Sequence, residues 1–316
     1  MKIGVLSNPL SRRNLSGLRE VSEFLTLHDD VVHKELVDFA SLKIILGEFA
    51  LVGVKLLVIN AGDGTVSAVL TEIFEHNAFP DIPWLAVLPG GTSNTIAGDV
   101  GLTGNRVKSL RRLISVVERG VVDQHSLTRP LIRVRYDPEM PAVIGMFFGT
   151  ASICDAISLR RRMFPQKWIP DPIASVLTLG YVLGGLLFGR GGVLRGYVIR
   201  IDLEAGSEPE TRFSLLMVTT LRRIFLGGSP FWGDGDGRLK FTSIRSPASG
   251  LVRNAYRILY GRDKSKLPQA IYRSASVDQI ALRMRCTFNL DGEFFEPVAN
   301  TAVTLTSPSA ARFVQC

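Results

Sequence analysis

Short apolar runs alternate with helix-like segments through the first third of this 316-residue chain, and this alternation constrains the fold more than any other feature. The runs KIGVLS (2–7), VKLLVIN (54–60) and IPWLAVLP (82–89) have the length and composition of buried strands. The stretches between them have helical spacing and short links. Strands and helices in alternation imply parallel strands joined by right-handed crossovers. We therefore predict an open, mainly parallel α/β sheet for the N-terminal domain.

The pattern changes after about Arg129. The later apolar segments alternate with polar residues or are rich in aromatic and β-branched residues, and Gly, Pro and Asp turns separate them. Helical segments at about 153–163 and 172–188 interrupt this pattern. We predict two domains, an α/β domain at 1–128 and a mainly antiparallel β-sandwich at 129–316, with a cleft between them.

The composition indicates which kinds of partner and which cellular compartment to expect. The net charge of +8 attracts anions such as nucleotides, nucleic acid or an acidic bilayer. The three cysteines are far apart and form no CxxC pair, which argues against a disulfide framework or a thiolate zinc site and fits a reducing compartment. The N-terminal stretch does not resemble a signal peptide. We expect a cytoplasmic protein.

One stretch, residues 173–189, is uncharged and apolar but interrupted by glycines. It is shorter than the roughly 20 apolar residues that span a bilayer. We interpret it as a buried or interfacial helix.

Three loops follow the predicted parallel strands: Asn8-Pro9, AGDGT (61–65) and PGGTSN (89–94). Ligands of open α/β sheets bind beyond the carboxyl ends of the strands. Glycine lets the backbone approach a phosphate without a Cβ atom between them, and helix N-termini attract anions. Taken alone, the Gly-Asp-Gly turn is better explained as an ordinary turn that ends a strand, and Thr92, Ser93 or Asn94 could simply cap a helix. Two glycine-rich loops at one sheet edge favour phosphate binding.

These motifs, in this order and spacing, resemble the catalytic domain of the diacylglycerol kinase and sphingosine kinase superfamily, especially its compact bacterial lipid kinases. Later segments extend the likeness over nearly the whole chain: GTASICDA (149–156), LTLGYVLGGL (177–186), GGSPFWGDGDGRLKF (227–241) and NLDGEFF (289–295). The resemblance implies an N-terminal domain akin to that of NAD kinases, ATP on the glycine loops, and a lipid in the cleft.

The resemblance also implies roles for single residues. Asp63 would hold or orient a catalytic Mg²⁺, which prefers oxygen ligands. The chain has no GxxxxGK[ST] sequence, so backbone amides and Mg²⁺ would have to balance the phosphate charge. The expected nucleotide-binding residues are Asn8, Gly62, Asp63, Gly64, Thr65, Gly90, Gly91, Thr92 and Asn94.

Two further sites lie in the second domain. LDGEF reads as a hairpin with Asp291-Gly292 at its turn, and on the residues alone Glu293 is an exposed side chain just after it. The resemblance makes Glu293 the base that takes the proton of the lipid hydroxyl. It also suggests a structural Mg²⁺ on the Asp236 side chain and the carbonyls of Gly233 and Arg238, against the alternative of a tight surface turn. The spacing excludes an EF-hand.

Three departures from the family pattern leave other functions open. Ala61 replaces a glycine, Ser67-Ala68 replaces Asn-Glu, and VTTLRR (218–223) lacks an asparagine. An NAD kinase, or a non-catalytic nucleotide- or lipid-binding protein, are the alternatives to a lipid kinase. The acceptor lipid is left open.

We expect no nucleic-acid partner. The basic residues at 160–162 are candidates for peripheral contact with anionic headgroups at the inner membrane face. An edge strand of the second domain is a candidate for homodimer formation.

Overall fold

The computed structural model describes residues 1–164, 173, 177–178, 180–181, 196–203, 206–207, 209–224, 227–262 and 264–316. Two compact units divide the chain. The first comprises Met1–Leu131, Val143–Gly145 and Ser309–Cys316, and the second comprises Ile132–Ala142 and Met146–Pro308.

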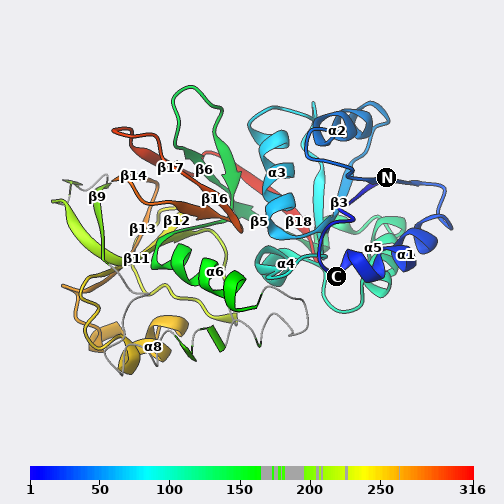
Figure 1. The fold of residues 1–316 in the computed structure, drawn as a ribbon. Helices are drawn as coiled ribbons and strands as arrows, with labels where there is room; N and C mark the ends of the chain where they lie inside the picture. Colours follow the sequence, from blue (N-terminus) through cyan, green and yellow to red (C-terminus); the bar gives the residue numbers. More distant parts are fainter. Residues whose placement is uncertain are drawn as a thin grey trace. The chain divides into compact units, whose positions relative to one another are not determined.

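The first unit contains one sheet with the strand order β2-β1-β3-β4-β18-β5 (Figure 1). Strands β1 to β4 are parallel, as the alternation of strand and helix predicts. The elements are β1 (Ile3–Ser7), α1 (Asn14–Leu25), β2 (Val31–Glu35), α2 (Leu42–Leu51), β3 (Leu56–Ala61), α3 (Asp63–Phe74), β4 (Trp84–Pro89), α4 (Thr95–Val100), α5 (Arg106–Glu118), η1 (Val122–His125), β5 (Ser126–Pro130), β7 (Val143–Gly145) and β18 (Ala310–Val314).

Helices cover both faces of this sheet. Alternate side chains of β1 and β3, such as Val5 and Val58, pack in one core cluster with Phe24 of α1 and Leu113 of α5. The opposite face meets α2: a Cβ atom on Gly4 would lie 3.3 Å from the ring of Phe49. Because β1 and β3 are covered on both sides, all their residues are buried, which explains their continuous apolar sequences.

The C-terminal strand β18 joins the sheet of the first unit. It lies parallel to β4 and antiparallel to β5, and Phe313 and Val314 are buried there. The predicted division at residues 128 and 129 assigned this strand, and residues 143–145, to the second domain. Local sequence patterns report which residues form a strand, but they carry no information on a pairing between segments more than 180 residues apart.

The second unit is an antiparallel β domain, as predicted. Its main path is β16-β15-β8-β11-β9-β14-β17-β6, with β12 and β13 joined to β11 and with β10 joined to β9. The elements are β6 (Ile132–Arg135), β8 (Phe147–Ala151), α6 (Ser152–Met163), β9 (Tyr197–Leu203), β10 (Gly206–Ser207), β11 (Thr211–Thr219), β12 (Leu239–Arg245), α8 (Leu251–Tyr260), η3 (Lys264–Lys266), β13 (Tyr272–Val277), β14 (Gln279–Met284), β15 (Phe288–Leu290), β16 (Glu293–Phe295) and β17 (Val303–Thr306).

Strand β11 is where this sheet divides. One edge of β11 pairs with β12, while the other pairs first with β9, at 211–213, and then with β8, at 215–219. A register irregularity between Phe213 and Leu215 marks the change of partner. Such irregularities bend a strand, which allows one strand to serve two parts of a sheet.

The predicted apolar helix at 173–189 lies outside the described residues, apart from positions 173, 177, 178, 180 and 181. Among the residues that the structure does describe, none of the helices combines the length and the apolar character needed to cross a bilayer.

Candidate functional site

The two glycine loops lie side by side at the carboxyl edge of the first sheet. They follow neighbouring parallel strands, in which Ala61 is paired with Pro89. The amide of Gly90 donates to the carbonyl of Ala61 at 3.1 Å. A Cβ atom on Gly90 would lie 2.8 Å from the nitrogen of Ala61, and one on Gly91 would lie 2.3 Å from the Cα atom of Gly62. These glycines are therefore needed first for the contact between the loops.

Asp63, in the loop after β3, connects that loop to the segment that follows the loop after β4. It is buried at the start of α3, and its carboxylate accepts hydrogen bonds from the amides of Thr95 at 2.8 Å and Ile96 at 3.0 Å. Those amides open helix α4, so the carboxylate caps its N-terminus. Burial raises the pKa of Asp63, and the amide hydrogen bonds oppose this effect.

The chemistry of Asp63 is also compatible with a magnesium ion. A carboxylate has about four lone-pair directions. The amides of Thr95 and Ile96 use one on each oxygen, and the hydroxyls of Ser93 and Thr95 also hydrogen-bond to the carboxylate, so Mg²⁺ would have to replace one of these hydroxyl donors. Mg²⁺ usually keeps several waters and takes one or two protein carboxylates besides the substrate phosphates, so it does not need a cluster of acids. The predicted role of Asp63 as a magnesium ligand stays a prediction.

A third loop, after β1, holds the first glycine loop in place. Asn8 is buried, and its Nδ2 donates to Thr65 Oγ1 at 2.9 Å. Asn14 Nδ2 donates to the carbonyls of Asn8 and Asn60, both at 2.8 Å. The sequence analysis missed Asn14, although a buried amide in the first turn of a helix is unusual. Its position explains how the ends of β1 and β3 are kept in register.

The same loop contacts both glycine loops through Ser11 and Arg13. Ser11 Oγ accepts a hydrogen bond from the amide of Gly62 at 3.2 Å, and the amide of Arg13 donates to the carbonyl of Gly90 at 2.9 Å. Arg106 of α5 donates to the side chain of Asn14 and to the carbonyl of Arg13. These contacts depend on three separate segments, and no local pattern indicates them.

Asn94 stabilises the second glycine loop from within. It has φ 50° and ψ 41°, in the left-handed region, and its Oδ1 accepts a hydrogen bond from the amide of Gly91 at 2.7 Å. Its Nδ2 donates back to the carbonyl of Gly91 at 3.0 Å. Helix α4 begins at Thr95, as the sequence predicts. The accessible part of the loop is therefore Thr92, which is half-buried, and Ser93, which is exposed.

Ser67, at the most serious departure from the family pattern, has a contact inside the first unit. Its hydroxyl is buried and donates to the carbonyl of Ile144 at 2.7 Å. Thr71, one turn later, accepts a hydrogen bond from the amide of Ile144 at 2.9 Å. Ser67 therefore fastens β7 to α3.

In the second unit, the LDGEF motif forms the predicted hairpin. Asp291 and Gly292 have positive φ angles of 49° and 101°, and Leu290 pairs with Glu293 across the turn. Two positive φ angles in a two-residue loop match the twist of a hairpin. The side chain of Glu293 is exposed. Its predicted role as a base stays a prediction.

Asp291 fixes this hairpin to its neighbour. Its buried carboxylate accepts hydrogen bonds from the amides of Met146 at 2.8 Å and Phe147 at 2.9 Å. Arg161 of α6 holds the other side, because its Nη2 donates to the carbonyl of Gly292 at 2.8 Å and its guanidinium lies 4.8 Å from the ring centroid of Phe294. Asp291 and Arg161 thus position the segment that presents Glu293.

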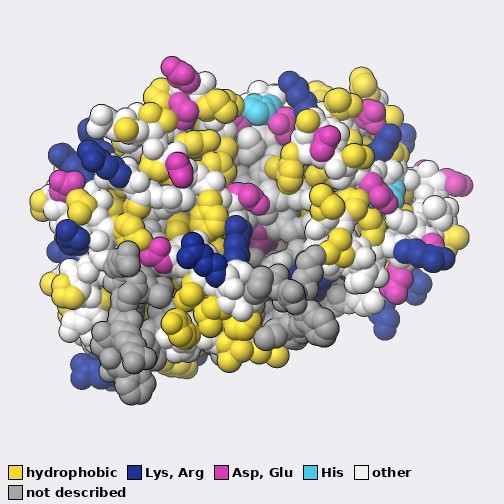
Figure 2. Space-filling model, viewed as in Figure 1, with side chains coloured by type: hydrophobic (Ala, Val, Ile, Leu, Met, Phe, Trp, Pro, Cys, Tyr) yellow, Lys and Arg dark blue, Asp and Glu magenta, His cyan; other side chains and the backbone are white. Residues whose placement is uncertain are grey.

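Arg161 belongs to the basic last turn of α6, Arg160 to Arg162, where Figure 2 shows Lys and Arg side chains gathered. Arg161 is therefore engaged by the hairpin, through Gly292 and Phe294. Contact of this turn with anionic headgroups stays a prediction.

The Gly-Asp-Gly-Asp-Gly run packs against β13. A Cβ atom on Gly233 would lie 2.4 Å from the nitrogen of Ala275, and one on Gly237 would lie 2.3 Å from the nitrogen of Val277. The close packing explains these glycines without a metal. Asp236 is exposed, and no group of three or more His, Cys, Asp or Glu side chains in the described part of the chain is placed to hold a metal ion. One carboxylate and two carbonyls are still oxygen donors of the kind that Mg²⁺ takes, and the site at Gly233, Asp236 and Arg238 stays a prediction.

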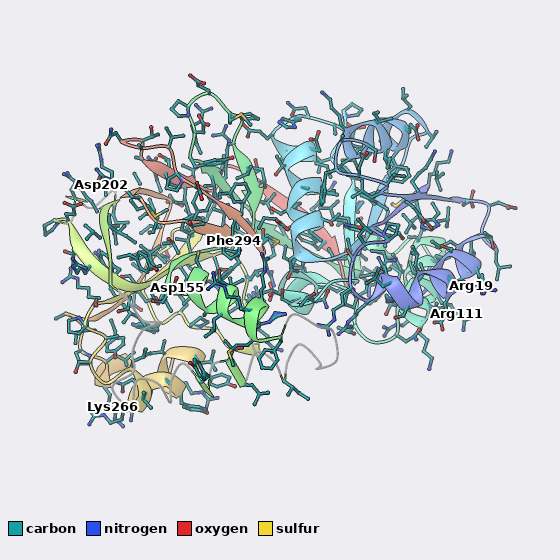
Figure 3. The ribbon with its side chains drawn as sticks, viewed as in Figure 1. Arg19, Arg111, Asp155, Asp202, Lys266 and Phe294 are labelled. Atoms are coloured by element: carbon teal, nitrogen blue, oxygen red, sulfur yellow. The ribbon has the colours of Figure 1, made fainter. Side chains whose placement is uncertain are left out.

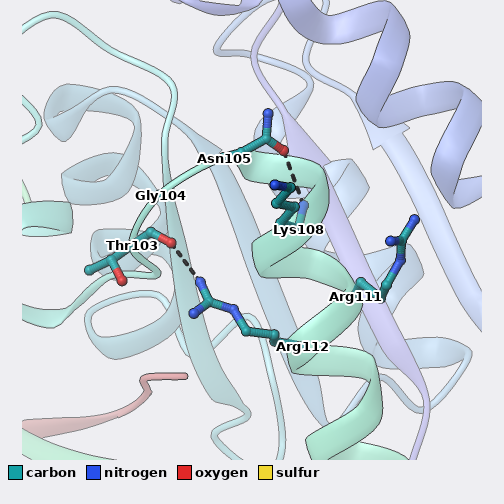
Figure 4. Close-up of a pocket in the computed structure, with 6 residues that line it drawn as sticks. All are labelled: Thr103, Gly104, Asn105, Lys108, Arg111 and Arg112. Carbon is teal, nitrogen blue, oxygen red and sulfur yellow. Dashed lines mark hydrogen bonds between the residues drawn. The ribbon is translucent and has the colours of Figure 1, made fainter.

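A pocket of about 570 Å³ lies beside the first turns of α5 and is separate from the glycine loops (Figure 4). Arg112 donates to the carbonyl of Thr103 at 2.6 Å, and the guanidinium of Arg111 lies 5.7 Å from the ring centroid of Phe24. Two of the three cations therefore already have contacts within the protein, and we assign the pocket no catalytic role. Its lining residues are Thr103, Gly104, Asn105, Lys108, Arg111 and Arg112.

Adjoining loops at the carboxyl edge of a parallel sheet form an arrangement that is suited to binding phosphates. Residues 2–122 match the family described as diacylglycerol kinase catalytic domain. The predicted resemblance to this family is therefore confirmed for residues 2–122, which lie in the first unit. The comparison with curated proteins gives no match.

Solved structures share the fold over the whole chain. A diacylglycerol kinase from Bacillus anthracis str. Sterne is 16% identical, with a TM-score of 0.61 over 99% of this chain and 96% of that one. Another protein of this organism, assigned the same activity, is 18% identical, with a TM-score of 0.63 over 100% and 97%. Yeast NADH kinase, in a complex with NADH, is 9% identical, with a TM-score of 0.51 over 100% and 84%. At these identities the likeness shows the two-domain fold, including the NAD kinase-like first domain.

Proposed function

We propose that this protein is an ATP-dependent lipid kinase, which transfers the γ-phosphate of ATP to a lipid hydroxyl. The observation that carries the proposal is the contact between the two glycine loops, with Asp63 linking them, in a domain of the diacylglycerol kinase catalytic family. Phosphoryl transfer needs positioning and charge stabilisation more than covalent chemistry from the protein. A closely packed pair of loops beside the N-terminus of α3 supplies both.

In the proposed reaction, the loops of the first unit bind the nucleotide. The first turn of α3, at Asp63 and Gly64, has backbone amides without intrahelical acceptors, and these favour anions. Thr65 and Asn8 fix that turn through their side-chain hydrogen bond. Thr92 and Ser93 provide the accessible groups of the second loop. When bound, Mg²⁺ would neutralise charge on the β- and γ-phosphates, and Asp63 would be its protein ligand.

Glu293 is the proposed general base. Its carboxylate takes the proton of the lipid hydroxyl as that oxygen bonds to the γ-phosphorus and the bond to the β-phosphate oxygen breaks, which releases ADP. A base of this kind contributes about 10²- to 10⁴-fold. The exposure of Glu293 within its own unit leaves the carboxylate free to meet a substrate, while the buried Asp291 serves the hairpin.

The acceptor is to be identified with a lipid panel. The full chain is incubated with γ-³²P-ATP, Mg²⁺ and one acceptor at a time: diacylglycerol, a sphingoid base, ceramide, phosphatidylglycerol or NAD. Products are separated by thin-layer chromatography, and released phosphate is measured in parallel. A labelled lipid that disappears with Glu293→Gln supports the proposal. Labelled NADP instead would indicate an NAD kinase, and ATP binding without any transfer would indicate a non-catalytic protein.

A further inference from the structure

Helix α8 of the second unit has an outward face of arginine and tyrosine. Tyr256 and Tyr260 are 60% and 37% exposed, and Arg253 is exposed as well. These three positions are three and four residues apart, so they share one side of the helix. The tyrosine ring centroids lie 5.0 Å apart, and Arg262 donates to the hydroxyl of Tyr256 at 3.3 Å. The face is thus a continuous strip of aromatic rings edged by guanidinium groups.

The opposite side of α8 is fixed to the protein. Ile258 is buried in a core cluster with Ile244, Leu267 and Tyr272. The C-terminal end is packed tightly, since a Cβ atom on Gly261 would lie 2.3 Å from the carbonyl oxygen of Phe231. The outward strip is therefore presented by a rigid element and is not needed for the core.

The segment around α8 is strongly basic. Residues 250–266 contain five Lys or Arg and one acid, Asp263, a net charge of +4 out of +8 for the whole chain. Lys266, in the short helix that follows α8, extends the basic surface (Figure 3). Charge complementarity therefore calls for an anionic partner.

We infer that α8 docks this protein on the surface of an anionic phospholipid bilayer. A convex helix face cannot enclose a small anion, but it can lie along an extended surface. Tyrosine has an apolar ring and a polar hydroxyl, and such rings favour the headgroup level of membranes. Arginine beside it adds attraction to anionic lipids. The choice of a bilayer over other polyanions rests on the proposed function, because a lipid substrate lies in a membrane.

Vesicle sedimentation of the full chain, without ATP, tests the inference. We expect binding to vesicles of phosphatidylcholine with phosphatidylglycerol and weak binding to phosphatidylcholine alone. Arg253→Gln with Arg262→Gln should lower the affinity for anionic vesicles by about 25-fold, at roughly fivefold for each charge. Tyr256→Ser with Tyr260→Ser should also lower it. The matched control, Arg135→Gln with Arg285→Gln, removes two exposed charges elsewhere in the same unit, at the end of β6 and just after β14.

The inference fails if both α8 variants bind like the wild type, or if the control loses as much affinity as they do. It also fails if a polynucleotide or an acidic protein competes for α8 while anionic vesicles do not. Thermal unfolding of each variant confirms that its fold is intact. In nonionic detergent micelles, where docking is bypassed, the α8 variants should keep the wild-type kinase rate. Vesicle binding without any kinase activity would overturn the proposed function and leave the docking surface standing.

Discussion

Gly62 and Gly91 pack backbone against backbone, so that a Cβ atom on Gly91 would lie 2.3 Å from the Cα atom of Gly62. Ordinary Cβ atoms do not approach another carbon so closely, and neither backbone can yield without moving its loop. Contact between the motifs thus explains Gly62, Gly90 and Gly91. This contact also fixes the start of α3, whose first-turn amides are the proposed phosphate site, beside the second glycine loop.

Replacing Gly91 with alanine should separate the loops. The added methyl group meets backbone, and overpacking of this kind costs about 1–3 kcal/mol of unfolding free energy. Urea unfolding followed by circular dichroism measures the loss. Gly98→Ala is the matched control, because nothing lies within 4 Å of its Cβ position on helix α4. There alanine should be neutral or stabilise by up to ~1 kcal/mol. Equal stability of the two variants would contradict the packing argument.

Asp63→Asn should loosen the start of α4. The amide group keeps one acceptor oxygen, so one of the hydrogen bonds from Thr95 and Ile96 is lost, together with the negative charge at the helix N-terminus. Hydrogen bonds to charged groups contribute about 1.5–3 kcal/mol. Hydrogen exchange of the Thr95 and Ile96 amides should therefore accelerate by roughly 10- to 100-fold. Unchanged exchange in the variant would show that the cap is dispensable.

Glu293→Gln should remove turnover and leave stability alone. The side chain is exposed, and substitutions at such positions usually change stability by less than about 0.5 kcal/mol. Loss of a general base lowers the rate by about 10²- to 10⁴-fold. Lipid phosphorylation and thermal unfolding are measured on the same preparation. A variant that retains the wild-type rate would leave Glu293 without a catalytic role.

Asp291→Asn should lower stability clearly and the kinase rate only in part, which is the opposite of the result expected for Glu293→Gln. Its buried carboxylate accepts from the amides of Met146 and Phe147, and asparagine can replace only one of these acceptors. Asparagine tolerates a positive φ, so the turn itself survives. We expect a loss of about 1–3 kcal/mol, measured by urea unfolding. A partial fall in kinase rate should follow from the displaced hairpin. Glu293→Gln in the same hairpin serves as the control with intact stability.

Strands, helices and turns could be predicted from the sequence where the residues of a single segment determine its structure. Buried parallel strands are continuous apolar runs, and Asp291-Gly292 carries its own turn preference, so both were found. Strand β18 was assigned to the other domain because its partners β4 and β5 are distant in the sequence. Whether a strand belongs to one sheet or another is decided by packing, which has no local signature.

The same distinction between local signals and distant contacts applies to the site residues. Asp63 and Asp291 each sit beside a glycine in a turn, and the sequence does not show that both carboxylates are buried as hydrogen-bond acceptors for another segment. Asn14 reads as an ordinary helical residue until its contacts with Asn8 and Asn60 are seen. The glycine content predicts a close approach of the backbone, and the structure shows one such approach, between the two loops. The predicted approach of a phosphate stays a prediction.

Cys154 should be slow to react with alkylating reagents. Burial raises the pKa of Cys154 from the ordinary 9.0 to about 12, with smaller contributions from Cys286 and Asp155. At pH 8 this leaves about 1,000-fold less thiolate than an unperturbed thiol has. Intrinsic nucleophilicity rises with pKa, so the net fall in rate is roughly 30- to 50-fold before access is considered. Timed iodoacetamide labelling with mass spectrometry of the three cysteine peptides measures it.

The pH dependence has a definite sign. Below pH 12 each unit of pH increases the thiolate of Cys154 about tenfold, so its labelling rate should keep rising where an ordinary thiol has levelled off near its pKa of 9.0. Because the folded chain holds this proton more tightly than the unfolded chain, stability falls as pH rises from about 9 to 12. Cys154→Ala should remove that part of the alkaline loss. A labelling rate that levels off near pH 9 in the native protein would show that the thiol is not desolvated.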